Sequence, residues 1–255
     1  HTRTHARTHT HTHRRPHTHT QVRALGDGEV VVRDGVLGPE FVRGCAAAVR
    51  GLDGSVFAPF GTGRRDEPGP SVSERLRGDH CAWFDERGAL DSGPSGWQQS
   101  GDQIARLQPR LPELAELFAN FDAIRLELNE ACFLSLNSLD CQLARYPADG
   151  VSGYPRHVDA LRTRGSVAES GSRRRVITCI VYLNEGWAVE HGGELRIWGA
   201  ADMAGTIVDG VGVMAPPRCD IVPALGRLVL FSSVAVPHAV LPSCAQRHAA
   251  TAWFC

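Results

Sequence analysis

The sequence contains no lysine, since all 27 of its Lys and Arg residues are arginine. This absence excludes any chemistry that depends on a lysine amine. A strong charge of either sign is also missing, because the formal net charge is −1 at pH 7. No overall field then draws the protein onto nucleic acid or an anionic membrane. We therefore expect neither as a partner.

Paired cysteines and long apolar runs are missing as well. None of the eight cysteines forms a C-x-x-C pair, which disfavours a disulfide framework or a zinc finger. Cys179 lies in the apolar run VITCIVYL, where a free thiol behaves as a small hydrophobic group. A reducing compartment, the cytoplasm or the nucleus, is therefore expected. No apolar run approaches the roughly 20 residues that a membrane-spanning helix needs.

The first 21 residues differ in composition from the rest. Residues 1–20 form a His/Thr/Arg tract that carries seven of the 12 histidines and nothing apolar enough to fold. Such a tract predicts disorder over residues 1–21, and a metal-scavenging or anion-binding tail is the functional alternative. We expect one folded domain over residues 22–255.

The first half of this domain has helical patterns. The run EVVVRDGV predicts a short strand at 29–36, and the run from Pro39 predicts a helix at 39–52, with its proline in the first turn. Apolar residues recur at helical spacing over 102–121, where two prolines are expected to split the helix. Residues 22–138 are therefore predicted to be a helical support region.

From residue 139 the pattern changes to short β-branched runs between turn residues. These runs are DCQLARYP, RVITCIVYLN, GGELRIW, CDIVPALGRLVLFSS, AVPHAVLP and RHAATAWFC. The pattern predicts an antiparallel sandwich or barrel over residues 139–255. The preceding helices are expected to pack on one outer face of a sheet, since an apolar stripe must be buried. The predicted fold class is mainly β with supporting helices.

Three residues could hold a metal ion. In an extended segment the side chains of His157 and Asp159 project to the same side. His238 lies 79 residues beyond Asp159, several strands later. Two imidazoles and one carboxylate leave three positions open on an octahedral ion, the arrangement of non-haem Fe(II) oxygenases. An H-x-D pair alone is common by chance, so the prediction needs support from a residue outside the three ligands.

Arg247 provides that support, nine residues beyond His238 and across a turn that returns the next strand toward the same cavity. A guanidinium there can bind a carboxylate with two parallel hydrogen bonds while the other end of a 2-oxo acid binds iron. Tyr182 shares a strand face with Thr178 and Ile180 and could donate to the same carboxylate. Core packing would explain Tyr182 equally well.

These segments resemble the prolyl hydroxylases of the oxygen-sensing type, within the 2-oxoglutarate oxygenase superfamily. The similarity is close along residues 141–254, and LRGDHCAWFDE (76–86) resembles that family's RGD-x-x-x-W segment. The resemblance implies a double-stranded β-helix (jelly-roll) core, with Fe(II) bound by His157, Asp159 and His238.

The resemblance also implies roles for the residues around the iron. Arg247 and Tyr182 would bind the far carboxylate of 2-oxoglutarate, with Tyr146 close to it. The expected substrate pocket consists of Tyr154, Arg175, Trp253, Asp79 and Trp83. Plainer explanations are core packing for Trp253 and a solvated arginine run for Arg175.

Two departures from the family leave substrate selection open. Residues 160–174 form a long Arg/Ser/Gly-rich segment, and residues 202–218 resemble a second insertion. The carboxylate of Asp159 disfavours the superfamily's halogenases, which need that coordination site for halide. The secretory collagen-type prolyl hydroxylases are disfavoured too, because they use a lysine where this chain has Arg247.

The resemblance implies hydroxylation of a prolyl residue in an intracellular protein, in a reaction that consumes O2 and releases succinate and CO2. Ascorbate is expected as the reductant, oxygen sensing as a role, and a monomer as the state of the protein. Two alternatives stay open: an oxygenase that acts on a non-prolyl side chain or a small molecule, and a non-enzymatic β-sandwich that binds metal.

Overall fold

The structure is a computed structural model that describes residues 25, 28–59, 78–84, 90–91, 111–160, 175–199, 206–208, 211–213 and 215–255. The tract of residues 1–21, the expected start of a helix at 102–110 and residues 161–174 lie outside the described residues. The same holds for several residues of the second insertion. Predictions for these segments therefore stay predictions.

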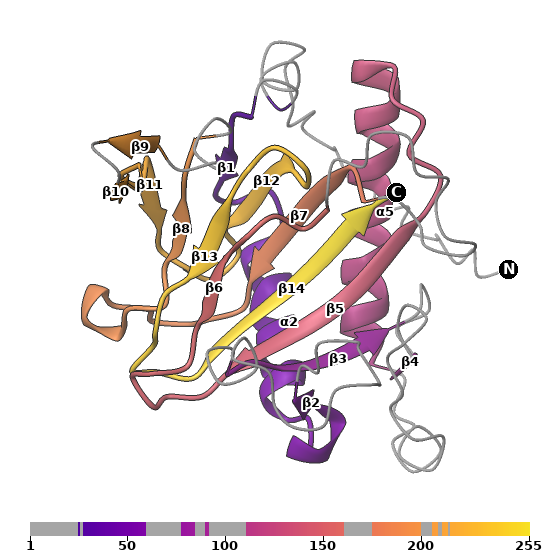
Figure 1. The fold of residues 1–255 in the computed structure, drawn as a ribbon. Helices are drawn as coiled ribbons and strands as arrows, with labels where there is room; N and C mark the ends of the chain where they lie inside the picture. The colour runs from indigo at the N-terminus through magenta and orange to yellow at the C-terminus, as the bar shows by residue number, and fades with distance from the viewer. Residues whose placement is uncertain are drawn as a thin grey trace, which may run out of the picture.

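Two antiparallel sheets form the core (Figure 1). In spatial order, the main sheet contains β1 (Val31–Arg33), β12 (Leu228–Ser232), β7 (Ile177–Tyr182), β14 (Arg247–Phe254), β5 (Leu139–Tyr146), β3 (His80–Phe84) and β2 (Ala58–Pro59), with β4 (Leu90–Asp91) paired to β3. The smaller sheet contains β11 (Cys219–Ile221), β8 (Leu195–Ile197), β13 (His238–Val240) and β6 (Tyr154–His157). A separate hairpin joins β9 (Thr206–Val208) and β10 (Val211–Val213).

Consecutive strands of the two sheets in the C-terminal half alternate between the sheets except at one step, because β8 and β11 both lie in the smaller sheet. The chain runs from β5 in the main sheet to β6 in the smaller one, then to β7, β8, β11, β12, β13 and β14. Residues far apart in sequence are thereby brought to the space between the sheets. This arrangement confirms the predicted double-stranded β-helix, and every run predicted as a strand after residue 139 contains one.

Helix α2 (Pro39–Arg50) confirms the predicted first helix and has its proline in the first turn. Helix α5 (Pro112–Cys132) also starts with a proline, so the ring removes no internal hydrogen bond. The predicted end of this helix at Phe121 was wrong by eleven residues. Ile124 and Leu128 continue the same buried stripe, and the helix ends where Phe133 adopts a left-handed conformation with φ of 53°. Short 3-10 turns lie at η1 (Gly54–Val56) and η2 (Val189–His191).

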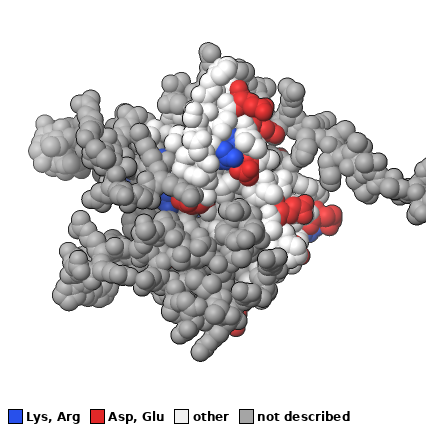
Figure 2. Space-filling model, turned by 90° about the vertical axis from the view of Figure 1, so that its right-hand side faces the viewer, with Lys and Arg blue, Asp and Glu red and all other residues white. Residues whose placement is uncertain are grey.

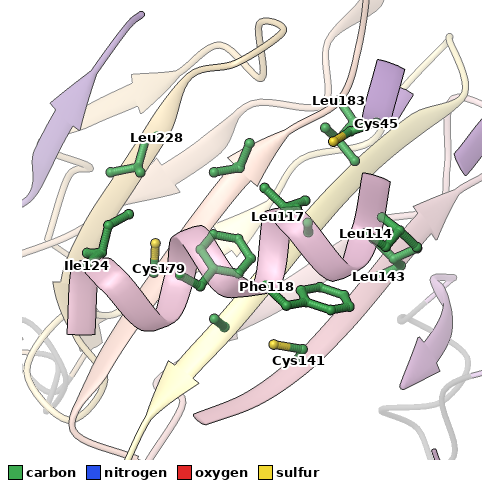
Figure 3. Packing of buried hydrophobic residues seen from close by; sticks show 14 of the residues in the cluster. Cys45, Leu114, Leu117, Phe118, Ile124, Cys141, Leu143, Cys179, Leu183 and Leu228 are labelled. Atoms are coloured by element: carbon green, nitrogen blue, oxygen red, sulfur yellow. The ribbon is translucent and has the colours of Figure 1, made fainter. Parts of the chain in front are cut away.

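The two helices cover the face of the main sheet that points away from the smaller sheet, as predicted (Figure 1). Figure 3 shows Leu114, Leu117 and Phe118 of α5 packed against Cys141 and Leu143 of β5, with residues of the neighbouring strands beside them. Because side chains alternate along a strand, the residues between these on β5 face the smaller sheet. One sheet face thus supports the fold, and the other is left for a site.

Figure 2 shows the side of the molecule on which α5 lies in Figure 1. Acidic groups lie in several places on the described surface there, among uncharged areas, and basic groups are few and separate. The described residues of this side form no continuous basic surface of the kind that nucleic-acid binding requires. Among the described helices, none is both long and apolar enough to cross a membrane.

The packing of α5 makes a stability prediction. Leu117 is fully buried, whereas Leu126 on the same helix is 49% exposed. We expect Leu117→Ala to lower the free energy of unfolding by about 2–5 kcal/mol, because it leaves a cavity in the core. The matched substitution Leu126→Ala should change it by less than about 1 kcal/mol. Urea denaturation followed by circular dichroism measures both, and equal losses would contradict this packing.

Candidate metal centre and adjoining pocket

Pairing of β13 with β6 brings three metal-ligating side chains together. His238 lies directly opposite His157 in this ladder, and Asp159 is two residues beyond His157. One ligand atom of each of these three residues lies within 4.8 Å of the others. The Nε2 atoms of His157 and His238 are 3.5 and 3.7 Å from Oδ1 of Asp159. The three residues therefore converge on one point.

Hydrogen bonds to the backbone fix which nitrogen of each imidazole faces that point. Nδ1 of His157 lies 2.9 Å from the carbonyl oxygen of Pro155, and Nδ1 of His238 lies 3.0 Å from that of Val236. A carbonyl oxygen only accepts, so each Nδ1 carries the proton and donates it. Each Nε2 then keeps its lone pair for a metal ion.

The carboxylate of Asp159 is oriented from the main sheet. Thr178 on β7 donates a hydrogen bond of 2.6 Å from Oγ1 to Oδ2 of Asp159, and this hydroxyl is also 2.8 Å from Oγ of Ser233. With Oδ2 engaged, Oδ1 faces the two imidazoles. Thr178 and Ser233 lie 19 and 74 residues beyond Asp159 in the sequence, so no local pattern could have revealed this contact.

The pKa values in this cluster suit metal binding at neutral pH. Burial opposes ionisation of Asp159, but the imidazoles of His238 and His157 and the Thr178 hydrogen bond hold its pKa below the usual range. Burial, together with the neighbouring His157, lowers the pKa of His238 to about 4. The carboxylate is therefore ionised and His238 is neutral, the forms in which both bind a metal.

This donor set fits Fe(II). Two imidazoles and one carboxylate arranged on one side of an ion are the ligands of non-haem iron oxygenases. Aromatic rings hold the imidazoles in place, since Tyr154 stacks on His157 at 3.6 Å and Phe231 lies 4.8 Å from His238 between ring centres. These contacts fix the orientation of both imidazole rings.

A cavity of about 260 Å³ adjoins the three ligands. Of the residues expected at the site from the sequence, the structure places these at the cavity wall: Asp79, Trp83, Tyr146, Tyr154, His157, Asp159, Arg175, His238, Arg247 and Trp253. Tyr182 lies just behind the wall, with its ring 5.1 Å from the guanidinium of Arg247. Residues from both sheets and from the region before residue 139 therefore meet in one place.

Arg247 is a buried cation at one end of this cavity. It begins β14, is 2% exposed and donates from Nε to the carbonyl oxygen of Gly193 at 2.8 Å. Its guanidinium lies 5.0 Å from the ring centre of Tyr146. Among the described residues, no carboxylate pairs with it. Since a buried charge without a counter-ion is costly, Arg247 is suited to hold an anionic group of a ligand.

The hydroxyl of Tyr182 completes this anion site. It is buried and makes no hydrogen bond to any described residue. Burial raises the pKa of Tyr182, although the charge of Arg247 opposes this, so the hydroxyl keeps its proton as a donor. A free O–H donor beside an unpaired guanidinium fits a carboxylate.

The opposite side of the cavity is aromatic. Arg175 lies 3.8 Å above the ring of Trp253, and the rings of Trp253 and Trp83 are 5.5 Å apart. Arg175 is therefore stacked on a wall of the cavity and is not merely a solvated arginine. Asp79 is 2% exposed and accepts a hydrogen bond from the thiol of Cys81 at 3.2 Å.

Several further residues belong to this region and were not expected there from the sequence. Ser233 contacts the hydroxyl that orients Asp159, and Gly193 binds Arg247. Gln142 and Thr251 line the cavity from β5 and β14. Strand parity could have indicated the last two, because Thr251 shares a face with Arg247 and Gln142 shares one with Tyr146.

The Thr178 hydrogen bond makes a prediction about metal affinity. We expect Thr178→Val to weaken binding of Mn(II), an air-stable substitute for Fe(II), by about 10- to 100-fold, because Asp159 loses the donor that orients it. Thr178→Ser keeps the hydroxyl and should bind as the wild type does. Calorimetric titration measures the affinities, and unchanged binding by the valine variant would show that the contact does not orient the ligand.

Comparison with known proteins supports this interpretation of the site. A family model described as the 2OG-Fe(II) oxygenase superfamily matches residues 141–255. Prolyl hydroxylase EGLN3 of Homo sapiens is 31% identical over 196 residues, which cover 73% of this chain and 72% of that protein. The match to human Egl nine homolog 1 is 30% identical and covers 74% of this chain but only 41% of that protein.

Solved structures of prolyl hydroxylases are also similar to this chain. A prolyl-4-hydroxylase of Pseudomonas putida has a TM-score of 0.61 and 29% identity, with 91% of this chain and 96% of that chain covered. A Trichoplax adhaerens prolyl hydroxylase, solved with a peptide fragment of hypoxia inducible factor, has a TM-score of 0.62 and 25% identity, with 91% and 86% covered. The chain therefore belongs to the 2OG-Fe(II) oxygenase superfamily, and its relatives there include EGLN-type prolyl hydroxylases.

Proposed function

We propose that this protein hydroxylates a prolyl residue of a protein substrate at the expense of 2-oxoglutarate and O2. The observation that carries the proposal is the buried, unpaired Arg247 in the same cavity as the facial set of His157, Asp159 and His238. A protein that only binds a metal ion would not need a buried cation beside the ion. A 2-oxo diacid needs both, because its 2-oxo acid end binds the metal and its far carboxylate binds the cation.

Each part of the cavity has a defined task in this proposal. His157, Asp159 and His238 hold Fe(II), which when bound supplies the oxidative decarboxylation of 2-oxoglutarate to succinate and CO2 and the transfer of an oxygen atom to the substrate. Arg247 and Tyr182 bind the far carboxylate of 2-oxoglutarate with charge-assisted hydrogen bonds. Tyr146, beside the guanidinium, limits the space in which this carboxylate can lie.

The prolyl substrate is proposed from the relatives and from the cavity wall. EGLN3 is named a prolyl hydroxylase, and the Trichoplax enzyme was solved with a hypoxia-inducible-factor peptide. Here Trp253, Trp83 and Tyr154 provide aromatic surface, which suits a proline ring. Arg175 and Asp79 add one charge of each sign at this wall. We include ascorbate as the reductant, and a single oxygenase domain over residues 22–255.

The hydrogen bond from Arg247 to the carbonyl oxygen of Gly193 leads to a prediction about 2-oxoglutarate affinity. Gly193 has φ of +71°, and an added Cβ would lie 3.1 Å from Ser243 and 3.2 Å from Cδ of Arg247. We expect Gly193→Ala to displace Arg247 and weaken 2-oxoglutarate binding by roughly 10-fold, with Mn(II) affinity unchanged.

Gly186→Ala is the matched control for this change. Gly186 has φ of +61° and nothing within 4 Å of an added Cβ, so it tests backbone strain without contact with the site. Tryptophan fluorescence titration in the presence of Mn(II) measures both variants. Equal weakening in the two would mean that strain, and not Arg247, causes the effect.

Turnover tests the function itself. Protein supplied with Fe(II), ascorbate, 2-oxoglutarate and O2 should add one oxygen atom to prolyl peptides, seen by mass spectrometry, and release succinate in equal amount. Peptides with alanine in place of the proline should give neither product. Succinate release coupled only to non-prolyl side chains or small molecules would overturn the prolyl assignment but keep the oxygenase.

Arg247→Ala distinguishes the oxygenase from a metal-binding sandwich without catalysis. The variant should raise the KM for 2-oxoglutarate by roughly 30-fold or more, because a buried charge-assisted contact is lost. Arg196→Ala removes an arginine that pairs with Asp220 on the outer face of the smaller sheet and should leave this KM unchanged. An unchanged KM for 2-oxoglutarate in Arg247→Ala, or no turnover of 2-oxoglutarate by the wild type, would favour the metal-binding sandwich.

A further inference from the structure

Gln142 is a buried polar side chain on the wall of the cavity. In the sheet register it lies on β5 between Trp83 of β3 and Thr251 of β14. It is 4% exposed, it lines the cavity, and its Nε2 makes no hydrogen bond to any described residue. Buried amide groups in native proteins are nearly always paired, so an unpaired one at a cavity wall points to a ligand.

A second unpaired donor lies next to it. The indole Nε1 of Trp253 is buried at the same wall and also makes no hydrogen bond to a described residue. Since Trp253 is two residues beyond Thr251, which pairs with Gln142, the two side chains are diagonal neighbours on one sheet face. Side chains in this relation are within reach of one another. Two N–H donors are therefore available to the same ligand.

The position of Gln142 separates it from the metal and from the carboxylate site. Thr178, which binds Asp159, is on β7, whereas Gln142 is on β5, and β14 runs between these two strands (Figure 1). Along β14 the anchoring Arg247 is four residues from Thr251, roughly 13 Å at 3.3 Å per residue. The amide thus lies on the side of the cavity that β3 and Arg175 border, away from the far carboxylate of 2-oxoglutarate.

The chemistry of the two groups selects the ligand. An indole N–H only donates, and the amide Nε2 offers two further donors. Because both groups are unpaired donors, they fit an acceptor oxygen. A prolyl segment offers mainly acceptors, because proline has no N–H and its own and neighbouring carbonyl oxygens remain.

We propose that Gln142 is a specificity-determining residue, whose carboxamide, with the indole N–H of Trp253, binds a main-chain carbonyl oxygen of the substrate next to the prolyl residue. This inference depends on the proposed prolyl hydroxylase function. It gives Gln142 a role in peptide recognition and none in binding metal or 2-oxoglutarate.

Gln142→Met tests the inference, because methionine has a similar length and no donor. With a prolyl peptide that the wild type hydroxylates, the variant should lose roughly 5- to 50-fold in kcat/KM for the peptide. Its KM for 2-oxoglutarate and its thermal midpoint should stay close to the wild-type values. Gln142→Glu, which puts a carboxylate in place of the donor, should lose at least as much.

Gln246→Met is the matched control, the same change at an exposed residue outside the cavity, and should keep the wild-type kcat/KM. Two outcomes would overturn the role of Gln142 alone: an unchanged peptide kcat/KM in Gln142→Met, or a raised KM for 2-oxoglutarate in place of a peptide effect. A wild type that hydroxylates no prolyl peptide would instead refute the proposed function, and the peptide subsite with it, before any variant is made.

Discussion

The site depends on a buried guanidinium that has no carboxylate partner among the described residues. Arg247 is 2% exposed, and its Nε donates to the carbonyl oxygen of Gly193, which carries no full charge. A charge in such a place destabilises the fold unless a ligand provides the opposite charge. Arg247 also begins β14. Because side chains alternate along a strand, Ala249, Thr251 and Trp253 face the same cavity as Arg247.

Strand alternation divides the main sheet into a supporting face and a working face. On β5, Cys141 and Leu143 pack against the helices, while Gln142 and Tyr146 face the cavity. The smaller sheet closes the cavity with β6 and β13, which carry two of the metal ligands, and Thr178 on β7 ties the third ligand to the main sheet. The geometry of the metal centre thus depends on both sheets.

The strand-containing runs after residue 139, the sheet class and the convergence of distant residues could be predicted from the sequence, because periodicity and turn residues are local signals. Strand β3, which lies in the region predicted as helical support, was not expected. The end of α5 was placed too early, at Phe121, although the local stripe continues through Ile124 and Leu128. Contacts between distant residues could not be predicted. The hydroxyl pair of Thr178 and Ser233 joins residues 55 positions apart, and no spacing reveals such a contact. The roles of the cavity residues also could not be derived from spacing, and they depend on the family resemblance and on the geometry of the site.

The central claim is that one cavity holds a divalent metal ion and a 2-oxo diacid at the same time. The most direct measurement is the electron density of crystals grown without O2 in the presence of Mn(II) and 2-oxoglutarate. We expect a metal ion bound by Nε2 of His157, Nε2 of His238 and an oxygen of Asp159, with the far carboxylate of 2-oxoglutarate on Arg247 and Tyr182. A metal ion bound elsewhere, or 2-oxoglutarate bound away from Arg247, would contradict the claim.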